Sequence, residues 1–178
     1  MIKSTRFRRV RPLTDADAGA YRQLRLASAC ASSVPRRPEL LRELGLQARG
    51  WHNLPSLYAS EGGCAWGAFH SETLMGVIVA SRYLRREGVE LHLWGLYVQP
   101  LYRGSWAAGA LVNAALHWCR RQHPRAVTTQ MHRSEQRAMR WCKRKGFDLE
   151  DRGQQQTELV RLSLQCKPGR RPESRHGT

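Results

Sequence analysis

The segment from Leu91 to Leu111 contains residue types that together could hold a phosphate group. An apolar run ending at Val98 predicts a strand, a short turn then carries Arg103 and Gly104, and small residues predict the start of a helix. The N–H groups and dipole of a helix start attract anions, as does a guanidinium. The segment therefore predicts a site for a pyrophosphate-bearing cofactor.

Trp106 is the unusual residue of this turn. Small residues let a backbone approach a phosphate closely, and Gly reaches conformations that Trp does not readily adopt. If the position has ordinary helical angles, Trp106 is tolerated and its indole packs outward. If the position needs a positive φ, the loop is reshaped. The indole then blocks the groove in which the phosphate-bearing cofactor would bind. The sequence leaves both alternatives open.

The same turn resembles motif A of the GNAT N-acetyltransferase superfamily, which reads Val-x-Pro-x-Tyr-Arg-Gly-x-Gly-x-Gly/Ala-x-x-Leu. Trp106 stands where the family usually has Gly. The matching residues are Val98, Pro100, Tyr102, Arg103, Gly104, Ala108 and Leu111.

A later segment resembles motif B of that superfamily, Asn-x-x-Ala-x-x-x-Tyr-x-x-x-Gly-Phe. Ala138, Gly146 and Phe147 match, whereas Glu135 replaces the usual Asn and Cys142 replaces the usual Tyr. The resemblance extends from about residue 7 to residue 164.

The resemblance implies an α/β (α+β) GNAT fold, with a mixed, mostly antiparallel central sheet of six to seven strands and helices on both faces. It implies acetyl-CoA as cosubstrate, with the pantetheine arm along the strand near Leu96, Tyr97 and Val98. A β-bulge there would aim an N–H at the thioester oxygen. The other residues implied in CoA binding are Arg103, Gly104, Ser105, Trp106, Ala107, Ala108 and Glu135.

Two side chains on the same strand are candidates for the base that takes the proton from an acceptor amine. Glu90 stands where the histone-acetylating branch of the family has its catalytic Glu, and His92 is a second candidate because an imidazole needs little tuning to act as a base. Strand alternation places both on one face with Trp94. Alternatively, Glu90 is a surface carboxylate paired with Arg85 or Arg86.

Cys142 occupies the position of the family's general acid, which returns a proton to the CoA thiolate. A thiol could serve in this role. The alternative is a buried core Cys on the helix face that it shares with Ala138 and Trp141. In that case Tyr97 or Tyr102 could supply a hydroxyl.

Composition limits the class of protein. The chain has 178 residues and predicts one domain over residues 1–166, followed by a basic disordered tail over residues 167–178. No run of apolar residues is long enough for a membrane helix, and no signal peptide is recognised. Five scattered cysteines, without metal-ligand spacing, indicate reduced thiols and no metal site. We therefore expect a cytoplasmic protein without a membrane partner.

The formal net charge of +16 favours a polyanionic partner such as nucleic acid, unless it reflects only a solvated basic surface. Basic residues crowd both ends of the chain. The charge argues against a cationic acceptor and favours an acidic or nucleic-acid-associated one.

The periodicity predicts the elements that would position these residues. The expected strands cover residues 7–11, 64–70, 74–82, 89–98, 126–131, 147–151 and 158–164. The expected helices cover residues 16–28, 39–49, 107–121 and 135–145, and residues 51–60 are expected to form a loop.

Three hypotheses follow for the function. The first is an acetyl-CoA-dependent N-acetyltransferase that acts by direct attack in a ternary complex on an amine-bearing small molecule or protein. The second is a degenerate GNAT-fold protein that binds or regulates without catalysis, since both motifs depart from the family pattern. The third is an acetyltransferase whose target is associated with nucleic acid. The resemblance also makes a homodimer an expectation.

Overall fold

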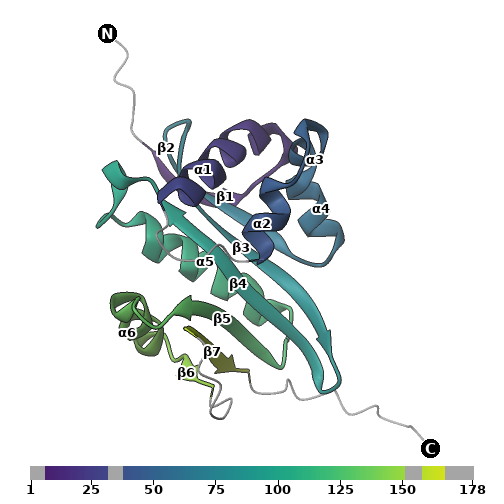
Figure 1. Ribbon diagram of the computed structural model, residues 1–178, viewed down its shortest axis with the longest axis vertical. Coiled ribbons are helices and arrows are strands. Elements are labelled where there is room, and N and C mark those ends of the chain that lie inside the picture. The colour runs from purple at the N-terminus through teal and green to yellow at the C-terminus, as the bar shows by residue number, and fades with distance from the viewer. Residues whose placement is uncertain (1–6, 32–37, 151–157, 167–178) are drawn as a thin grey trace, which may run out of the picture.

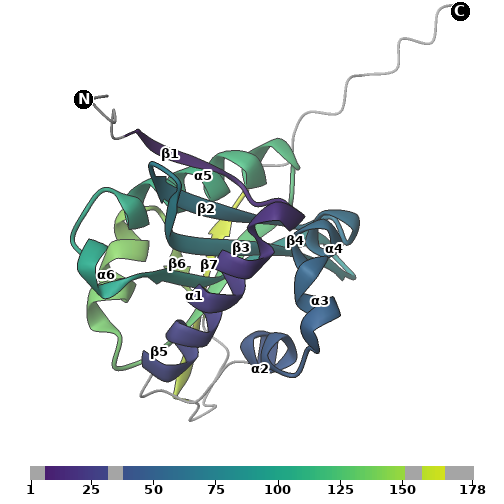
Figure 2. The ribbon, with the colours of Figure 1, turned by 90° about the horizontal axis from the view of Figure 1, so that it is seen from above.

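The computed structural model describes residues 7–31, 38–150 and 158–166, so the predicted tail over residues 167–178 lies outside the described residues. The described residues form one seven-stranded sheet with helices on both faces (Figures 1 and 2). The strand order is β1-β2-β3-β4-β5-β7-β6. Only β4 and β5 are parallel, and all other neighbours are antiparallel. The predicted mixed, mostly antiparallel fold class is confirmed.

The element bounds agree closely with the predicted ranges over most of the chain. The strands are β1 (Arg8–Pro12), β2 (Cys64–His70), β3 (Thr73–Arg85), β4 (Gly88–Val98), β5 (Ala126–His132), β6 (Asp148–Leu149) and β7 (Leu159–Gln165). The helices are α1 (Ala18–Ala31), α2 (Pro38–Leu44), α3 (Ala48–His52), α4 (Leu54–Ser60), α5 (Ala107–Arg121) and α6 (Gln136–Arg144), with 3₁₀ turns η1 (Asp15–Asp17) and η2 (Pro100–Tyr102).

The region before β2 differs from its prediction. The expected helix over residues 39–49 is divided into α2 and α3, and most of the expected loop over residues 51–60 is helical. Trp51, Leu54 and Tyr58 are all buried, at the spacing of one helical face. Burial of these apolar side chains stabilises α3 and α4, which are too short to be stable helices on their own. Pro55 is tolerated because it lies in the first turn of α4.

The core has two parts, one on each face of the sheet. The α5-side core packs α5 and α6 against residues such as Leu91 and Leu93 of β4. The α1-side core packs α1, α3 and α4 against Trp94 and Tyr97 of the same strand. Strand β4 is therefore covered on both faces, as its nearly continuous apolar sequence indicates.

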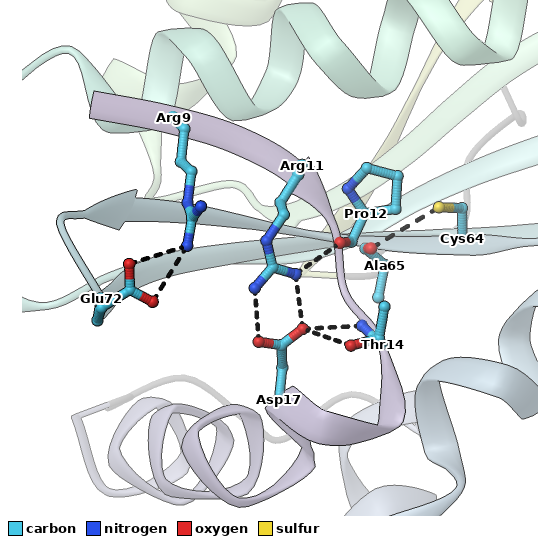
Figure 3. A network of polar contacts seen from close by, with 8 residues as sticks. All are labelled: Arg9, Arg11, Pro12, Thr14, Asp17, Cys64, Ala65 and Glu72. Atoms are coloured by element: carbon cyan, nitrogen blue, oxygen red, sulfur yellow. Dashed lines mark hydrogen bonds and ion pairs between the residues drawn. The ribbon is translucent and has the colours of Figure 1, made fainter. Parts of the chain in front are cut away.

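The entry into α1 is fixed by an ion pair between β1 and the turn that follows it (Figure 3). Arg11 donates to both carboxylate oxygens of Asp17, at 2.7 and 2.8 Å. The same carboxylate accepts the Thr14 N–H at 2.9 Å, as in a helix-capping interaction. The hydrogen bond from Arg11 and those from Thr14 lower the Asp17 pKa to about 2 against the opposing effect of burial. This network joins the end of β1 to the 3₁₀ turn that precedes α1.

Candidate active site

The two central strands diverge at the middle of the sheet. The parallel pairing of β4 with β5 runs from Glu90 opposite Ala126 to Leu93 opposite Thr129. Both strands continue past this point, β4 to Val98 and β5 to His132. Backbone atoms that would otherwise pair inside the sheet are therefore available to a ligand between the strands.

A β-bulge interrupts β4 where the divergence begins. Trp94 is paired with Val79 of β3, and the next pair along β4 is Tyr97 with Val77. The step covers three residues on β4 and two on β3, so β4 has one extra residue. Gly95 has a left-handed φ of 66°, which glycine adopts without strain. The extra residue reverses the alternation of the strand, because Trp94 and Tyr97 now face the same core. The bulge that the resemblance implied near Leu96 is present.

A cavity of about 330 Å³ lies at this divergence. Leu93, Gly95 and Leu96 line it from β4, and Thr129 and Met131 line it from β5. Helices from both faces of the sheet contribute to it: Arg25, Ser28 and Leu40 from α1 and α2, and Ala138, Trp141 and Cys142 from α6. The cavity therefore connects the two faces of the sheet.

The loop before α5 settles the question that Trp106 raised. Trp106 has φ −63° and ψ −21°, which are ordinary helical angles, and the left-handed residue of the loop is Gly104 at φ 74°. The indole is half-buried against the α5-side core and does not line the cavity. The tolerated alternative is therefore the one observed, but the indole packs inward rather than outward.

The same loop presents donors suited to a pyrophosphate. The backbone N–H groups of Gly104, Trp106, Ala108 and Gly109 have no acceptor within the described ranges. Arg103 donates from Nε to the Val98 carbonyl at 3.2 Å, and its side chain lines the cavity. The free amides and the start of α5 directly follow Arg103, which lines the cavity, so these residues fit the CoA phosphates.

The two predicted bases lie away from the cavity. Glu90 accepts hydrogen bonds from Arg161 at 2.6 Å and from Arg85 at 3.3 Å. Burial favours its neutral form, but the bonds and charges of these two arginines outweigh burial and lower the Glu90 pKa. The predicted pairing with Arg85 is thus observed, and Arg161 is an additional partner. His92 is buried, with Nδ1 3.0 Å from Thr128 Oγ1. Neither residue lines the cavity.

The predicted general acid and its two alternatives differ in whether they line the cavity. Cys142 is buried and lines the cavity, and burial, followed by the charge of Glu135, raises the pKa of its thiol. Tyr97 also lines the cavity. Tyr102 packs against the α5-side core and is not among the lining residues. Glu135, which replaces the motif B Asn, lines the cavity and accepts the His132 N–H at 2.9 Å.

Two ionisable residues of the cavity were missed by the sequence analysis. Arg25 follows the buried Tyr21 by one helical turn, and an Arg on the apolar side of this helix could have been recognised as unusual. His132 ends β5, with Nε2 3.1 Å from Glu158 Oε2 and Nδ1 2.6 Å from Ser134 Oγ. No local pattern marks His132, because the divergence of β5 from β4 places it at the cavity.

Diverging parallel strands, a bulged strand and an amide-rich loop define a site for an acyl group carried on a nucleotide-linked arm. The family model for the acetyltransferase (GNAT) family matches residues 26–147. The chain therefore belongs to the GNAT acetyltransferase family and is an acetyl-CoA-dependent acetyltransferase by class. No curated protein matches the chain significantly.

Solved structures share this fold at low sequence identity. YncA, a putative acetyltransferase from Salmonella typhimurium determined with acetyl-CoA, has a TM-score of 0.73 at 12% identity, covering 94% of this chain and 98% of its own. The PaiA N-acetyltransferase from Thermoplasma acidophilum, in complex with coenzyme A, has a TM-score of 0.67 at 16% identity, covering 90% and 99%. Naa50 from Arabidopsis thaliana, bound to a bisubstrate analogue, has a TM-score of 0.63 at 15% identity, covering 89% and 99%.

The described residues contain no helix long and apolar enough to cross a membrane. They also contain no group of three or more His, Cys, Asp or Glu residues placed to bind a metal ion.

Proposed function

We propose that this protein transfers the acetyl group of acetyl-CoA to the nitrogen of an amine acceptor by direct attack in a ternary complex. The observation that carries the proposal is the cavity that connects both faces of the sheet. The phosphate-binding loop lies at the start of α5, which covers one face, and α1 and α2 line the cavity from the other. Two substrates can therefore meet between the strands without an acylated side chain.

Acetyl-CoA supplies the activated acyl group when bound, and the protein supplies its orientation. The residues that would hold it are the backbone of Leu96 and Val98 for the pantetheine arm and Arg103 with the following loop for the phosphates. The bulged backbone near Leu96 would donate an N–H to the thioester oxygen as negative charge develops there. Such a donor contributes about 3–4 kcal/mol in other acyl-transfer enzymes.

His132 is the group that we propose as the general base. It lines the cavity, whereas Glu90 and His92 do not. The carboxylate of Glu158, 3.1 Å from Nε2, holds a proton on that nitrogen and would stabilise the imidazolium. Nδ1, which accepts the Ser134 N–H at 3.2 Å, is then the atom that would take the proton of the acceptor amine, with the amine replacing this contact.

Cys142 and Tyr97 are the two candidates to return a proton to the leaving thiolate. Both line the cavity, and they approach it from opposite sides, Cys142 on α6 and Tyr97 on β4. Burial raises the pKa of the Cys142 thiol, which keeps its proton on sulfur but makes it a weaker acid, so Tyr97 stays an equal candidate.

The first test is isothermal titration calorimetry of the protein with acetyl-CoA and CoA, in parallel with Trp106→Gly. One saturable site of micromolar affinity in both proteins supports the proposal, because the indole packs against the core. Binding that appears only in Trp106→Gly would show a closed loop, and the noncatalytic hypothesis would then replace the acetyltransferase.

The second test uses the binding-competent protein and a panel of amines, with CoA release followed by a thiol reagent. His132→Gln is expected to lower the rate at least tenfold. His92→Gln is the matched control, since it removes a buried imidazole outside the cavity. An equal loss of rate in the two folded variants would argue against His132 as the base.

An acceptor associated with nucleic acid is a second candidate, and it is favoured by the exposed face of α6. Four basic residues on this nine-residue helix, Arg137, Arg140, Lys143 and Arg144, make no ion pair within the described part of the chain. Arg137, Arg140 and Arg144 are spaced by three and four residues, which places them on one side of the helix. The same helix lines the cavity through Ala138 on its inward side.

Fluorescence anisotropy with a labelled 20-nucleotide RNA tests this candidate. Replacing Arg137, Arg140 and Arg144 with Gln should reduce the salt dependence of binding by about two units of slope. Replacing Arg22, Arg86 and Arg121 removes the same charge from scattered exposed positions and is the matched control. Equal effects of the two triple variants would show that only net charge matters and would remove α6 as a binding face.

A further inference from the structure

A buried ionic cluster joins α1, α2 and α4 beside the cavity. Arg25 Nε donates to Glu43 Oε2 at 2.6 Å, and both side chains are only 2% exposed. The Tyr58 hydroxyl donates to the other carboxylate oxygen of Glu43 at 2.7 Å, and the Tyr21 hydroxyl donates to the same oxygen. Both oxygens of Glu43 are thereby occupied, and the Arg25 side chain is held in one orientation.

The held guanidinium is connected to the bulge of β4. Arg25 Nη1 donates to the Gly95 carbonyl at 3.1 Å, and the guanidinium lies 5.1 Å from the centre of the Trp94 ring. A Cβ at Gly95 would lie 2.8 Å from the same nitrogen. Arg25 therefore holds the carbonyl of Gly95, one of the two β4 residues that the bulge leaves without a partner on β3.

Because a peptide bond is planar, a contact to the Gly95 carbonyl also fixes the N–H of the next residue. The bond between Gly95 and Leu96 is trans, since the described residues contain no cis peptide. In a trans peptide the C=O and the following N–H point in opposite directions. When Arg25 fixes the Gly95 oxygen toward α1, it also fixes the direction of the Leu96 N–H, which points away from α1.

Stability alone does not explain a cluster of this kind. A buried ion pair can often be replaced by apolar side chains with no loss of stability, because desolvation offsets the attraction between the charges. An apolar pair, however, would leave the Gly95 carbonyl without its donor.

We infer that Arg25 is a positioning residue, which orients the Leu96 N–H toward the acyl oxygen of acetyl-CoA. Glu43, Tyr21 and Tyr58 hold its guanidinium in place for this purpose. The inference rests on the proposed function, since it requires acetyl-CoA between the diverging strands.

The test compares two ligands that differ in the carbonyl oxygen, acetyl-CoA and its thioether analogue S-ethyl-CoA, by calorimetry. We expect the native protein to prefer acetyl-CoA by roughly fivefold, as one neutral hydrogen bond provides. Arg25→Lys and the double variant Arg25→Met with Glu43→Met should lose this preference, with CoA affinity changed less than twofold. The double variant leaves no unpaired buried charge and is chosen to remain folded.

A second readout reports on the carbonyl directly. The ¹³C shift of bound [1-¹³C]acetyl-CoA should move toward its free value in both Arg25 variants. The matched control is Arg11→Gln with Asp17→Asn, which removes another ion pair at the start of α1 and should leave the ligand preference and the shift unchanged.

The outcomes separate the inference from the proposed function. Loss of both readouts in folded Arg25 variants supports the inference. An unchanged preference in those variants, or no preference in the native protein, overturns it while CoA binding still supports the proposed function. No binding of either CoA ligand by the native protein overturns both.

Discussion

Gly104 and Gly109 provide a test of how the phosphate-binding loop is built. At both positions an added Cβ has no atom of the surrounding described residues within 4 Å, apart from the adjoining backbone, so substitution by Ala meets no steric contact. They differ in backbone conformation, because Gly104 has φ 74° and Gly109 lies inside α5 with no positive φ. The pair therefore isolates the effect of the left-handed conformation.

The expected effects have opposite signs. A left-handed conformation costs an L-residue about 1–2 kcal/mol, and the reduced entropy of the unfolded chain offsets about 0.4–1 kcal/mol of this. Gly104→Ala should therefore lower the free energy of unfolding by about 1 kcal/mol. Gly109→Ala should raise it by about 0.5–1 kcal/mol, because Ala is the better helix former.

Urea unfolding of the two variants measures the difference, which should be about 2 kcal/mol, or about 4–8 °C in melting temperature. The CoA affinity of Gly104→Ala should fall about fivefold if the loop relaxes in the free protein and must regain its conformation on binding. Equal stability of the two variants would refute the argument, since it would show that the left-handed φ is not required at Gly104.

Three further predictions concern other parts of the molecule. The folded-state pKa of Asp17 is about 2, below the reference value of 3.8, so the stabilisation from its carboxylate is present above pH 4 and is lost as the pH falls toward 2. Urea unfolding should show a loss of about 1–2 kcal/mol in unfolding free energy over this range. The Asp17→Asn variant should not show this loss. Cys30 is exposed, whereas burial raises the pKa of Cys119 to about 12, so a thiol reagent at pH 8 should label Cys30 first and Cys119 only on unfolding, as peptide mapping would reveal. Glu90→Gln should lower the unfolding free energy by about 1–3 kcal/mol and leave acetyl-CoA affinity unchanged in calorimetry. A loss of acetyl-transfer activity at unchanged stability would instead support Glu90 as the general base.

The parts of the site that lie close together in the chain could be predicted from the sequence. The strand, turn and helix that contain Arg103 and Gly104 occur where the sequence indicated them, because local hydrophobic periodicity and small residues specify such a unit. The shared face of Ala138, Trp141 and Cys142 on α6 was also predicted, since helical spacing alone determines it.

The candidates for proton transfer could not be chosen in this way. Glu90 and His92 are on the expected face of β4, but they lie where β4 and β5 are still paired, and Glu90 contacts Arg161 from the distant β7. His132 reaches the cavity only because β5 diverges from β4 after Thr129. Contacts between residues far apart in the chain have no local pattern in a single sequence.

The strand–turn–helix of the phosphate-binding loop, the order of the main elements and the family can be predicted from the chain alone, because they depend on periodicity, turn chemistry and short motifs. The inward packing of Trp106, the contact of Arg25 with Gly95 and the connection of both sheet faces by the cavity are visible only in the folded molecule. Each of these depends on where two strands stop pairing and on which side chains from distant helices fill the space. Such outcomes depend on the packing of the whole chain rather than on any segment of it.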